Sequence, residues 1–426
     1  MASKTCLFIG RFQPFHLGHL EAMKWNLKRG NKLVIVIGSM QEYSTADNPL
    51  NFKERKSMVA LALAHAKINN YRLVGLPDFK NDELWSKKLL ELSGVNIKDA
   101  VVSSLNPWTE RVSQKAGIEV VRHPVFLGGL NATQIRKKIC ASKSWRQLVP
   151  GAVFGYLKDA GGAAKIKNFG RLPESKIVDF IKEKVKAASA SGAVVGISGG
   201  IDSATVAVLA KRALGKNVIC IALPPAQENA FESNVSALAQ KLKINILKKP
   251  VGGAFEAITK GLPAGDKRSS GNVFSRIRMV ILYYLANINN YLVLGTSNKS
   301  EMNLGYFTKF GDGGVDLEPI ADLYKTELEA MAKRIGVPDI ILGAAPTAGL
   351  WPGQTDEGEI GLPYFFLDTI FKLSDQGFVR QEISRLTGIS QSTIAKIEAR
   401  HAANLHKLVL PPVCDLKLTG NSSLLS

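Results

Sequence analysis

The run Ser198 to Ser203, with the sequence Ser-Gly-Gly-Ile-Asp-Ser, has the residue types of a loop that binds a phosphate group. It lies between a β-branched apolar run at 193–197 and a helix-forming run, so we expect it to join a buried parallel strand to a helix. Its two glycines permit a tight turn that exposes backbone N–H groups, and the helix N-terminus adds partial positive charge. Because Asp202 would repel an anion bound there, the loop predicts a magnesium ion between the two. The alternative interpretation is a plain turn whose Asp or Ser caps the helix.

A second run with phosphate-binding chemistry, Gly10 to His19, lies near the N-terminus. It follows a short apolar run and continues into a helix and a further apolar run, which is the pattern of a βαβ unit. His16 and His19 are three residues apart, so they share one face at a helix start and can both donate to phosphate oxygens. A single histidine is more often structural, but this pair beside Arg11 favours a nucleotide site.

The composition is that of a folded protein of two or three domains, with 426 residues, 46% hydrophobic and 21% charged. The sequence shows no apolar run of membrane-spanning length and no signal peptide at its start, so we expect a cytoplasmic protein. The cysteines are widely spaced, which favours reduced thiols over disulfides or a zinc site: Cys6, Cys140, Cys220 and Cys414. The net charge of +19 suits either nucleic acid or small polyanions such as ATP.

Strands and helices alternate on both sides of a weakly patterned Gly-Ala segment. We therefore predict an α/β protein with two Rossmann-like, doubly wound parallel-sheet domains. The expected boundaries are a first domain at 1–158, a linker at 159–172 and a second domain at 173–426.

The Gly10 to His19 run, together with the run Asn131 to Arg136, resembles the nucleotidyltransferase superfamily and, in detail, archaeal nicotinamide-nucleotide adenylyltransferases. The resemblance implies that Thr133 closes the site and that Trp85 stacks on a pyridine ring. It implies further nucleotide contacts at Gly10, Asp78 and Asn106, and an ATP triphosphate held by Arg11, His16, His19 and Arg136. Asp82 stands where an Asn is expected ahead of the tryptophan, which leaves the preference between acid and amide rings open.

The loop at 198–203 and a dense polar stretch, Phe307 to Asp316, resemble NAD synthetase, an ATP pyrophosphatase. The match continues through Ala345 to Glu357 and through His406-Lys407. It implies ATP contacts at Ser198, Gly199, Gly200, Asp202, Ser203 and Thr296. It also implies magnesium at Asp202 and Glu301, charge stabilisation by Lys325 and Thr347, and a substrate loop carrying Lys309, Asp312 and Asp316. Leu408 and Val409 replace the usual basic residues after Lys407, which weakens the expected dinucleotide phosphate contacts there.

A long apolar segment from Asn272 to Leu285 predicts a helix that is buried on several faces, and we favour a homodimer or larger homo-oligomer interface there. At the start of this segment, Asn272, Arg276 and Arg278 place polar and basic groups that can meet a carboxylate or phosphate, or else form a surface ion pair.

The two resemblances imply an enzyme of two ATP-dependent steps that act on small-molecule substrates. Adenylyl transfer to nicotinate or nicotinamide mononucleotide comes first, and ammonia then amidates nicotinate adenine dinucleotide to NAD. Amidation before adenylylation is the alternative order. A second alternative is a nucleotide-sensing nucleic-acid-binding regulator, because residues 381–399 have the pattern of a helix-turn-helix. Such patterns are common in packed helix pairs, so no nucleic-acid partner is expected.

Overall fold

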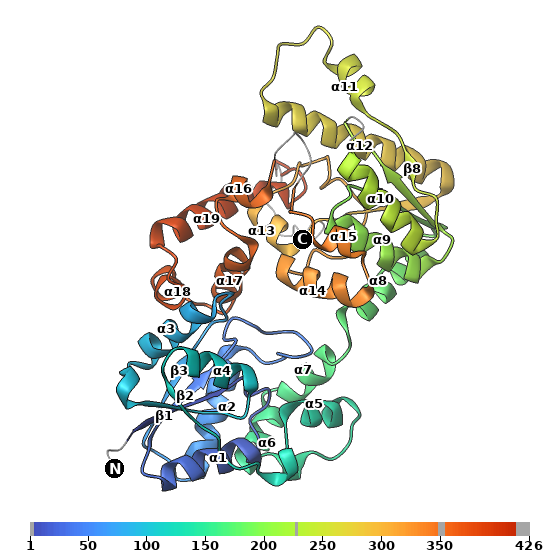
Figure 1. The fold of residues 1–426 in the computed structure, drawn as a ribbon. Helices are drawn as coiled ribbons and strands as arrows, with labels where there is room; N and C mark the ends of the chain where they lie inside the picture. Colours follow the sequence, from blue (N-terminus) through green and yellow to red (C-terminus); the bar gives the residue numbers. More distant parts are fainter. Residues whose placement is uncertain (1–3, 226–228, 348–353, 415–426) are drawn as a thin grey trace. The chain divides into compact units, whose positions relative to one another are not determined.

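The computed structural model describes residues 4–225, 229–347 and 354–414 (Figure 1). These residues form two compact units. The first unit lies within Met1–Lys176 and Phe366–Gln391, and the second lies within Ile177–Phe365 and Ser392–Ser426. The chain therefore passes between the units three times, and one crossing falls inside helix α17 (Tyr364–Asp375).

A five-stranded parallel sheet forms the centre of the first unit, with the strand order β3-β2-β1-β4-β5. Its strands are β1 (Thr5–Gly10), β2 (Lys32–Ile37), β3 (Tyr71–Gly75), β4 (Ala100–Ser103) and β5 (Glu119–Val121). The strand order reverses at β1, which pairs with β2 on one side and β4 on the other. The loops after β1 and β4 therefore leave the sheet at the edge where open α/β sheets bind ligands.

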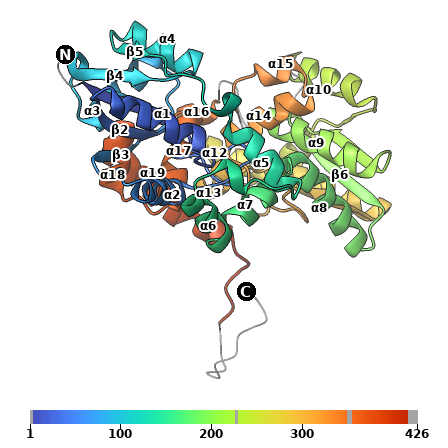
Figure 2. The ribbon, with the colours of Figure 1, turned by 90° about the horizontal axis from the view of Figure 1, so that it is seen from below.

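The helices of the first unit pack on this sheet or on one another (Figure 2). They are α1 (Leu17–Lys28), α2 (Phe52–His65), α3 (Asp82–Ser93), α4 (Pro107–Lys115), α5 (Ala132–Cys140), α6 (Gly151–Asp159), α7 (Gly162–Phe169), most of α17, and α18 (Arg380–Thr387). Alternate strand residues such as Leu7 and Val34 pack with Trp85 and Leu89 of α3, so one face of the sheet is buried under that helix.

The predicted linker at 159–172 contains helix α7, which packs against α5 and α6. Ile166 of this helix is buried. The glycines and alanines there indicated a break in the sequence pattern, but a short helix with one buried apolar residue fits the same composition. The predicted domain boundaries stay a prediction, because the compact units are not continuous stretches of chain.

A four-stranded parallel sheet forms the centre of the second unit, with the order β8-β7-β6-β9. Its strands are β6 (Gly192–Ile197), β7 (Val218–Ala222), β8 (Leu247–Lys248) and β9 (Tyr291–Leu294). Here the order reverses at β6, so the loops after β6 and β9 leave the sheet side by side.

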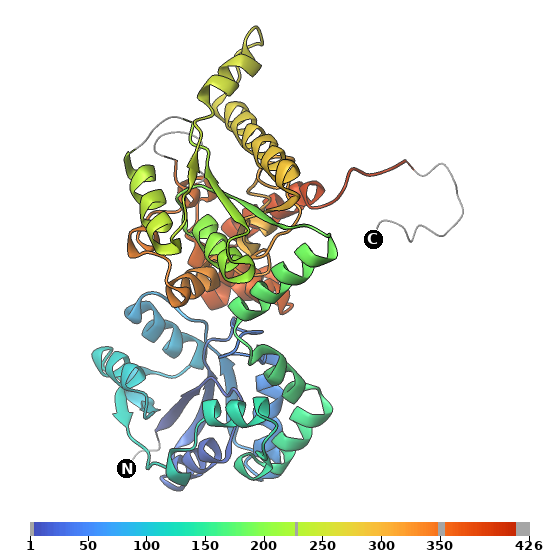
Figure 3. The same ribbon diagram turned by 90° about the vertical axis from the view of Figure 1, so that its right-hand side faces the viewer.

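Helices pack on both faces of this second sheet (Figure 3). The helices of the second unit are α8 (Pro173–Ala187), α9 (Ile201–Leu214), α10 (Asn229–Leu242), α11 (Gly252–Thr259), α12 (Lys267–Asn289), α13 (Lys299–Leu304), α14 (Lys325–Ile335), α15 (Asp339–Leu342), α16 (Asp356–Ile360) and α19 (Gln391–Asn404). On β6, Val195 faces the core of α9 and α14, whereas its neighbour Val194 faces α12. The predicted fold class, two parallel-sheet α/β domains, is confirmed. Among the described residues, no helix is both long and apolar enough to cross a membrane.

Candidate active sites

Two histidines lie where the loop after β1 enters α1, and each bonds to the other's backbone. His16 is the N-cap residue of α1, and its Nδ1 accepts the backbone N–H of His19 at 3.3 Å. In return, Nδ1 of His19 accepts the backbone N–H of His16 at 3.2 Å. Because Nδ1 is an acceptor in both rings, the proton of each neutral imidazole lies on Nε2. Each ring therefore keeps one N–H, at Nε2, that can donate to a ligand.

The local environment keeps both imidazoles neutral. The two rings stack with their centroids 3.5 Å apart and 21° between their planes. Burial lowers the pKa of His16 to about 4. Burial, together with the nearby His16 and His123, also lowers the pKa of His19 well below its usual value. At pH 7 the pair offers two N–H donors without positive charge, so the arginines must supply the cationic groups of this site.

Arg136 on α5 connects the two sequence motifs of the first unit. Its guanidinium donates to the backbone carbonyl of Gln13 at 2.9 Å, to the Asp47 carboxylate at 3.0 Å and to the Thr133 hydroxyl at 3.3 Å. Burial lowers the pKa of Arg136, while Asp47 opposes that shift. Through Gln13, the helix that carries Arg136 and Thr133 is fixed to the loop that carries the histidines. Arg11, in the same loop, is exposed, directly after the last residue of β1, Gly10.

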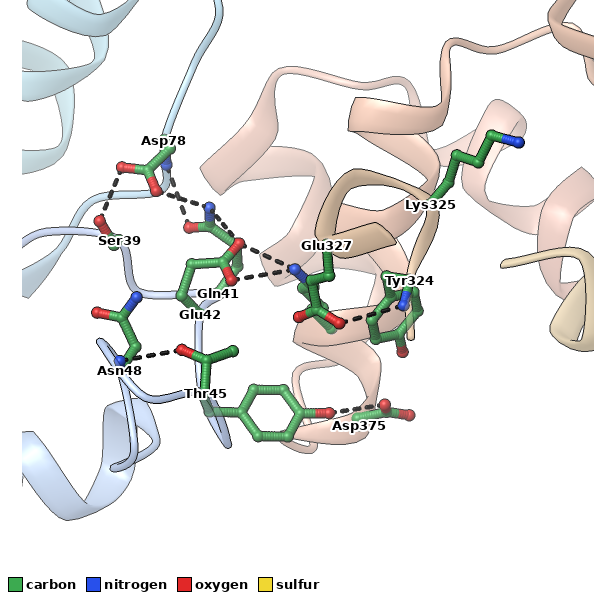
Figure 4. A network of polar contacts seen from close by, with 12 residues as sticks. Ser39, Gln41, Glu42, Thr45, Asn48, Asp78, Tyr324, Lys325, Glu327 and Asp375 are labelled. Atoms are coloured by element: carbon green, nitrogen blue, oxygen red, sulfur yellow. Dashed lines mark hydrogen bonds and ion pairs between the residues drawn. The ribbon is translucent and has the colours of Figure 1, made fainter. Parts of the chain in front are cut away.

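Asp78 lies at the centre of a polar network after β3 (Figure 4). One carboxylate oxygen accepts the Ser39 hydroxyl at 3.0 Å, and the other accepts the side-chain amide of Gln41 at 3.0 Å. The Gln41 amide oxygen in turn accepts the backbone N–H of Asp78 at 3.1 Å. Burial raises the pKa of Asp78, and its bonds to Ser39 and Gln41 oppose that shift. The network fixes the carboxylate to the loop after β2.

Arg55 of α2, to which the sequence analysis assigned no role, binds the loop after β2. The residue is fully buried, and its guanidinium donates to the carbonyls of Gly38 at 2.8 Å, Ser39 at 3.0 Å and Met40 at 3.3 Å. Burial lowers the pKa of Arg55 to about 10, with the carboxylate of Asp78 opposing the shift. The guanidinium therefore gives hydrogen bonds to carbonyls on three consecutive residues of this loop, and the Gly38 carbonyl accepts the shortest of them.

Two predicted nucleotide contacts of the first unit have structural partners. Trp85 is buried, with 4% of its surface exposed, and it meets Trp108 edge-on with centroids 4.9 Å apart. Asn106 is the N-cap residue of α4, where its side chain accepts the backbone N–H of Trp108 at 3.0 Å. Stacking of Trp85 on a pyridine ring and binding by Asn106 stay predictions.

The phosphate loop of the second unit follows β6, as the sequence predicted. Gly199 has a φ of 78°, which residues with a side chain rarely adopt. The hydroxyl groups of Ser198 and Ser203 lie 3.0 Å apart, and the Ser203 hydroxyl accepts the backbone N–H of Ser198 at 3.2 Å. Gly200 is the N-cap residue of α9 and donates its N–H to the Ser198 hydroxyl at 3.3 Å. The loop therefore combines two hydroxyls with the N-terminus of a 14-residue helix, an arrangement that suits a phosphate.

A buried lysine and two carboxylates lie beside this loop. Lys325, the first residue of α14, places Nζ 2.5 Å from one carboxylate oxygen of Asp202 and 4.0 Å from Glu301. The other Asp202 oxygen accepts the side-chain amide of Asn298 at 2.9 Å. Burial alone would lower the pKa of Lys325, but Asp202 and Glu301 raise it above its usual value. The ammonium group is therefore charged at neutral pH.

The carboxylates of this centre fit a magnesium ion. Burial raises the pKa of Glu301 and Asp202 raises it further, so a cation here would relieve the repulsion between the two. Oδ1 of Asp356 is buried without a hydrogen-bond partner among the described residues, which adds a third oxygen in the same charged neighbourhood. Within residues 4–225, 229–347 and 354–414, no group of three or more His, Cys, Asp or Glu side chains has metal-binding geometry. Phosphate oxygens of a nucleotide and water would complete the octahedral coordination that magnesium requires.

Asp312 lies on a loop that is fixed to helix α12. One of its carboxylate oxygens accepts the Ser275 hydroxyl at 2.8 Å and the backbone N–H of Thr308 at 2.8 Å. The Thr308 hydroxyl donates to the side chain of Asn272 at 2.9 Å. Arg278 of the same helix donates to the carbonyl of Leu223 at 2.9 Å, and burial lowers its pKa while Asp312 opposes that shift. The predicted residues Asn272, Arg278 and Asp312 thus come together around one loop.

Two lysines with predicted substrate contacts, Lys309 and Lys407, bind backbone carbonyls. Lys309 donates to the carbonyl of His406 at 2.6 Å, and Lys407 donates to the carbonyls of Gly305 at 2.6 Å and Phe307 at 3.0 Å. These two lysines join residues 406–409 to the 305–310 loop. Asp316 is also engaged, since its carboxylate accepts the Tyr283 hydroxyl at 3.1 Å and the backbone N–H of Val293 at 2.8 Å. Direct contact of these residues with a dinucleotide stays a prediction.

Two protein-family models match this chain. Residues 174–411 match the family model described as NAD synthase. The chain belongs to the NAD synthase family. Residues 7–123 match a second model, described as cytidylyltransferase-like. The chain is therefore an enzyme of NAD biosynthesis in which an NAD synthetase part follows a nucleotidyltransferase-like part.

Relatives of the NAD synthase part are found among archaea. It is 44% identical to the NH(3)-dependent NAD(+) synthetase of Methanococcoides burtonii over 245 residues, which are 56% of this chain and 93% of that protein. It is also 44% identical to the protein of the same name from Methanocaldococcus jannaschii, over 57% of this chain and 96% of that protein. Among solved structures, the NMN synthetase of Francisella tularensis is 33% identical over 57% of this chain and 97% of that chain, with a TM-score of 0.51.

Glu318 is a residue of the NAD synthase part that the sequence analysis missed. Its carboxyl group lies against the end of β9, where a Cβ atom on Gly295 would come within 2.4 Å of it. Oε2 of Glu318 is buried without a hydrogen-bond partner among the described residues. Burial raises the pKa of Glu318 to about 8, and a bond from Ser297 opposes that shift. Thr296 lies between Gly295 and Ser297 in the chain, so the carboxyl group of Glu318 borders the predicted ATP site. Only the folded chain, which brings residue 318 beside residue 295, reveals it.

The remaining predictions fall in the C-terminal half of the NAD synthase match. Thr347 is exposed. Residues 348–353 of the predicted 345–357 motif lie outside the described residues. The helix-turn-helix pattern at 381–399 is formed by α18 and α19, with Gly388 at φ 81° in the turn. This stretch lies inside the NAD synthase match, and the expectation of no nucleic-acid partner stays a prediction.

Proposed function

We propose that the first unit transfers the adenylyl group of ATP to nicotinate mononucleotide, or to its amide form. A phosphate oxygen of the mononucleotide would attack the α-phosphorus of ATP, and the bond to pyrophosphate would break. The chemistry needs positioning and neutralisation of charge at the phosphates. The Nε2–H donors of His16 and His19 and the guanidinium of Arg136 supply such groups beside one loop.

We infer that the second unit amidates nicotinate adenine dinucleotide with ammonia. The nicotinate carboxylate would attack the α-phosphorus of ATP and release pyrophosphate. Ammonia would then attack the carbonyl carbon, lose a proton and displace AMP. The observation that carries this proposal is the buried Lys325 beside Asp202 at the end of the phosphate loop, because a charged ammonium there can neutralise the negative charge that builds up at phosphorus. The names of the archaeal relatives support ammonia as the nitrogen donor.

ATP and magnesium complete the proposed chemistry. Ser198, Gly200, Ser203 and Thr296 would bind the ATP phosphates, and Asp202 with Glu301 would hold the metal. When bound, magnesium would neutralise phosphate charge and align the leaving pyrophosphate. Asp202 and Lys325 already lie in contact, so the protein holds opposite charges at this point before a ligand arrives.

The reverse order of steps is a second candidate. The solved relative from Francisella tularensis is named an NMN synthetase, and it is 33% identical over nearly its whole length. In that order, nicotinate mononucleotide would be amidated first and nicotinamide mononucleotide would then be adenylylated. Both orders use the same two sites.

A product analysis on the purified full chain distinguishes the two orders. Nicotinate mononucleotide, nicotinamide mononucleotide or nicotinate adenine dinucleotide is supplied with ATP, magnesium and ammonia, and mass spectrometry identifies the products. We expect NAD from nicotinate adenine dinucleotide, and this dinucleotide from nicotinate mononucleotide when ammonia is omitted. If amidation acts on the mononucleotide and never on the dinucleotide, the proposed order is wrong.

We further propose that a second copy of the chain covers helix α12. Val280, Tyr284 and Ile288 follow one another at four-residue spacing and are 60%, 64% and 62% exposed, so they form an apolar stripe on one side of the helix. Light scattering should give a dimer or larger oligomer for the wild type and a monomer for Tyr284→Lys. A monomeric wild type would refute this proposal.

A further inference from the structure

The first unit contains a segment from far along the chain. Residues 366–391, which include most of α17 and all of α18, belong to the same compact unit as residues 1–176. The same residues lie inside the 174–411 match to the NAD synthase family. Part of the NAD synthase sequence is therefore built into the unit with the nucleotidyltransferase-like fold.

Gln376, just after α17, forms hydrogen bonds to two segments of the first unit. It is 8% exposed, and its amide oxygen accepts the backbone N–H of Phe52 at 2.9 Å. Its amide nitrogen lies within hydrogen-bond distance of the carbonyls of Met40 at 3.2 Å and Gln41 at 3.1 Å. One side chain thus joins the start of α2 to the loop after β2.

A buried ion pair lies beside this amide. The ammonium group of Lys372 is 3.0 Å from both carboxylate oxygens of Glu42, and the lysine side chain is 3% exposed. Two weaker contacts extend the same surface, since Tyr43 donates its hydroxyl to Asp375 at 2.8 Å and the rings of Phe52 and Phe378 lie 5.9 Å apart. Loss of Glu42 would take a carboxylate partner from this buried ammonium group.

The segment that these residues hold is the loop of the Asp78 network. Gln41, whose carbonyl accepts from Gln376, donates its own side-chain amide to Asp78, and Figure 4 shows both Gln41 and Glu42 beside that carboxylate network. Arg55 binds the same loop through the carbonyls of residues 38–40 from the core side. The loop is therefore held by α2 on one side and by residues 372–376 on the other.

We propose that Gln376 and Lys372 are positioning residues of the adenylyl-transfer site, acting through the 38–42 loop on Asp78. The inference rests on the proposed function of the first unit. It means that the first site reaches its working geometry only when α17 and the residues after it are folded against the loop. The adenylyl-transfer site then depends on a sequence that belongs to the NAD synthase match.

Kinetics on the full chain test the proposal. Gln376→Met keeps the volume of the side chain and removes its hydrogen bonds, and Gln376→Glu keeps only the acceptor for Phe52. Gln381→Ala, at an exposed position on α18, is the matched control. We expect both Gln376 variants to raise KM for the mononucleotide about tenfold, because small misplacements of a binding loop are costly. KM for the dinucleotide in amidation should match that of Gln381→Ala. Partial unfolding alone would lower kcat in both reactions and leave both KM values unchanged.

Hydrogen exchange supplies a readout that does not depend on activity. The backbone N–H of Asp78 is bonded to Gln41, and that of Glu42 to the carbonyl of Ser39, so both report on the loop. We expect faster exchange at residues 38–42 and 78 in Gln376→Met than in Gln381→Ala. Unchanged exchange together with KM values within twofold of the control would overturn the proposal. A wild type that transfers no adenylyl group while the exchange difference is present would instead refute the proposed function of the first unit.

Discussion

The neutral state of His16 and His19 at the first site can be tested by a pH titration. The mutual bonds of His16 and His19 put the ring protons on Nε2, and burial opposes a positive charge. We expect nitrogen NMR of the imidazole rings to show the Nε2–H form of both histidines from pH 6 to 8. A titration near the ordinary pKa of 6.5 at either ring would contradict this expectation.

The same shift makes the first unit sensitive to acid. Folded His16 has a pKa of about 4 and the unfolded residue one of 6.5, so the unfolded chain binds more protons between these values. The free energy of unfolding therefore falls as the pH drops from 6.5 towards 4, by at most about 3 kcal/mol for this group. His16→Asn keeps a good helix cap without a titrating ring, so its free energy of unfolding should depend less on pH in this window. Equal slopes for both proteins would count against the assigned environment.

Glu318 predicts the opposite pH dependence in the second unit. Its pKa is raised to about 8 from the ordinary 4.5, so the folded state holds a proton that the unfolded state has lost. The free energy of unfolding should fall as the pH rises from 4.5 to 8. Glu318→Gln removes the titration, and its denaturation curves should shift less than those of the wild type between pH 5 and 8. A variant with the slope of the wild type would show that Glu318 ionises normally.

At the scale of elements, Arg55 decides whether the loop after β2 keeps its shape. Its guanidinium donates to the carbonyls of residues 38–40. The Ser39 carbonyl also accepts the backbone N–H of Glu42, and the Met40 carbonyl also accepts Gln376, so the Gly38 carbonyl depends most on Arg55. One unpaired buried carbonyl costs about 1 to 3 kcal/mol, so Arg55→Met should lower the free energy of unfolding by about that amount. Lys56→Met, at the exposed next position on α2, is the control. Urea unfolding compares the two, and similar midpoints would show that the loop keeps its shape without the guanidinium.

At the scale of the whole molecule, the two proposed reactions should be separable by mutation. The proposed ATP contacts of the first site lie on the loop after β1 and on α5, and the proposed contacts of the second lie on the loop after β6 and on α14. His19→Ala should abolish formation of the dinucleotide from the mononucleotide and leave amidation of supplied dinucleotide intact. Asp202→Asn should do the reverse, because it removes a carboxylate from the proposed magnesium site.

Both half-reactions should be measured on one preparation of each variant, with circular dichroism to verify folding. If a folded His19→Ala protein also lost amidation, the two sets of residues would act as one composite site. The proposed assignments for both units would then have to be redrawn.

The amino-acid sequence by itself determined the two α/β folds and the position of both phosphate loops. These features depend on local patterns: a short apolar run predicts a strand, and glycines followed by a helix-forming run predict the turn into α9. Cap residues act over three or four positions, so the start of α1 at the histidine pair could also be read from the chain.

Only the tertiary structure decided which distant residues share an environment. Arg55 and Glu318 have no special local pattern, and their altered pKa values follow from burial under elements that fold over them. The assignment of residues 366–391 to the first unit depends on the contacts of Gln376 and Lys372 with a loop more than 300 positions earlier. A local sequence pattern does not identify which distant segment a stretch will contact. Hydrogen bonds and ion pairs over such separations form only after both segments have folded.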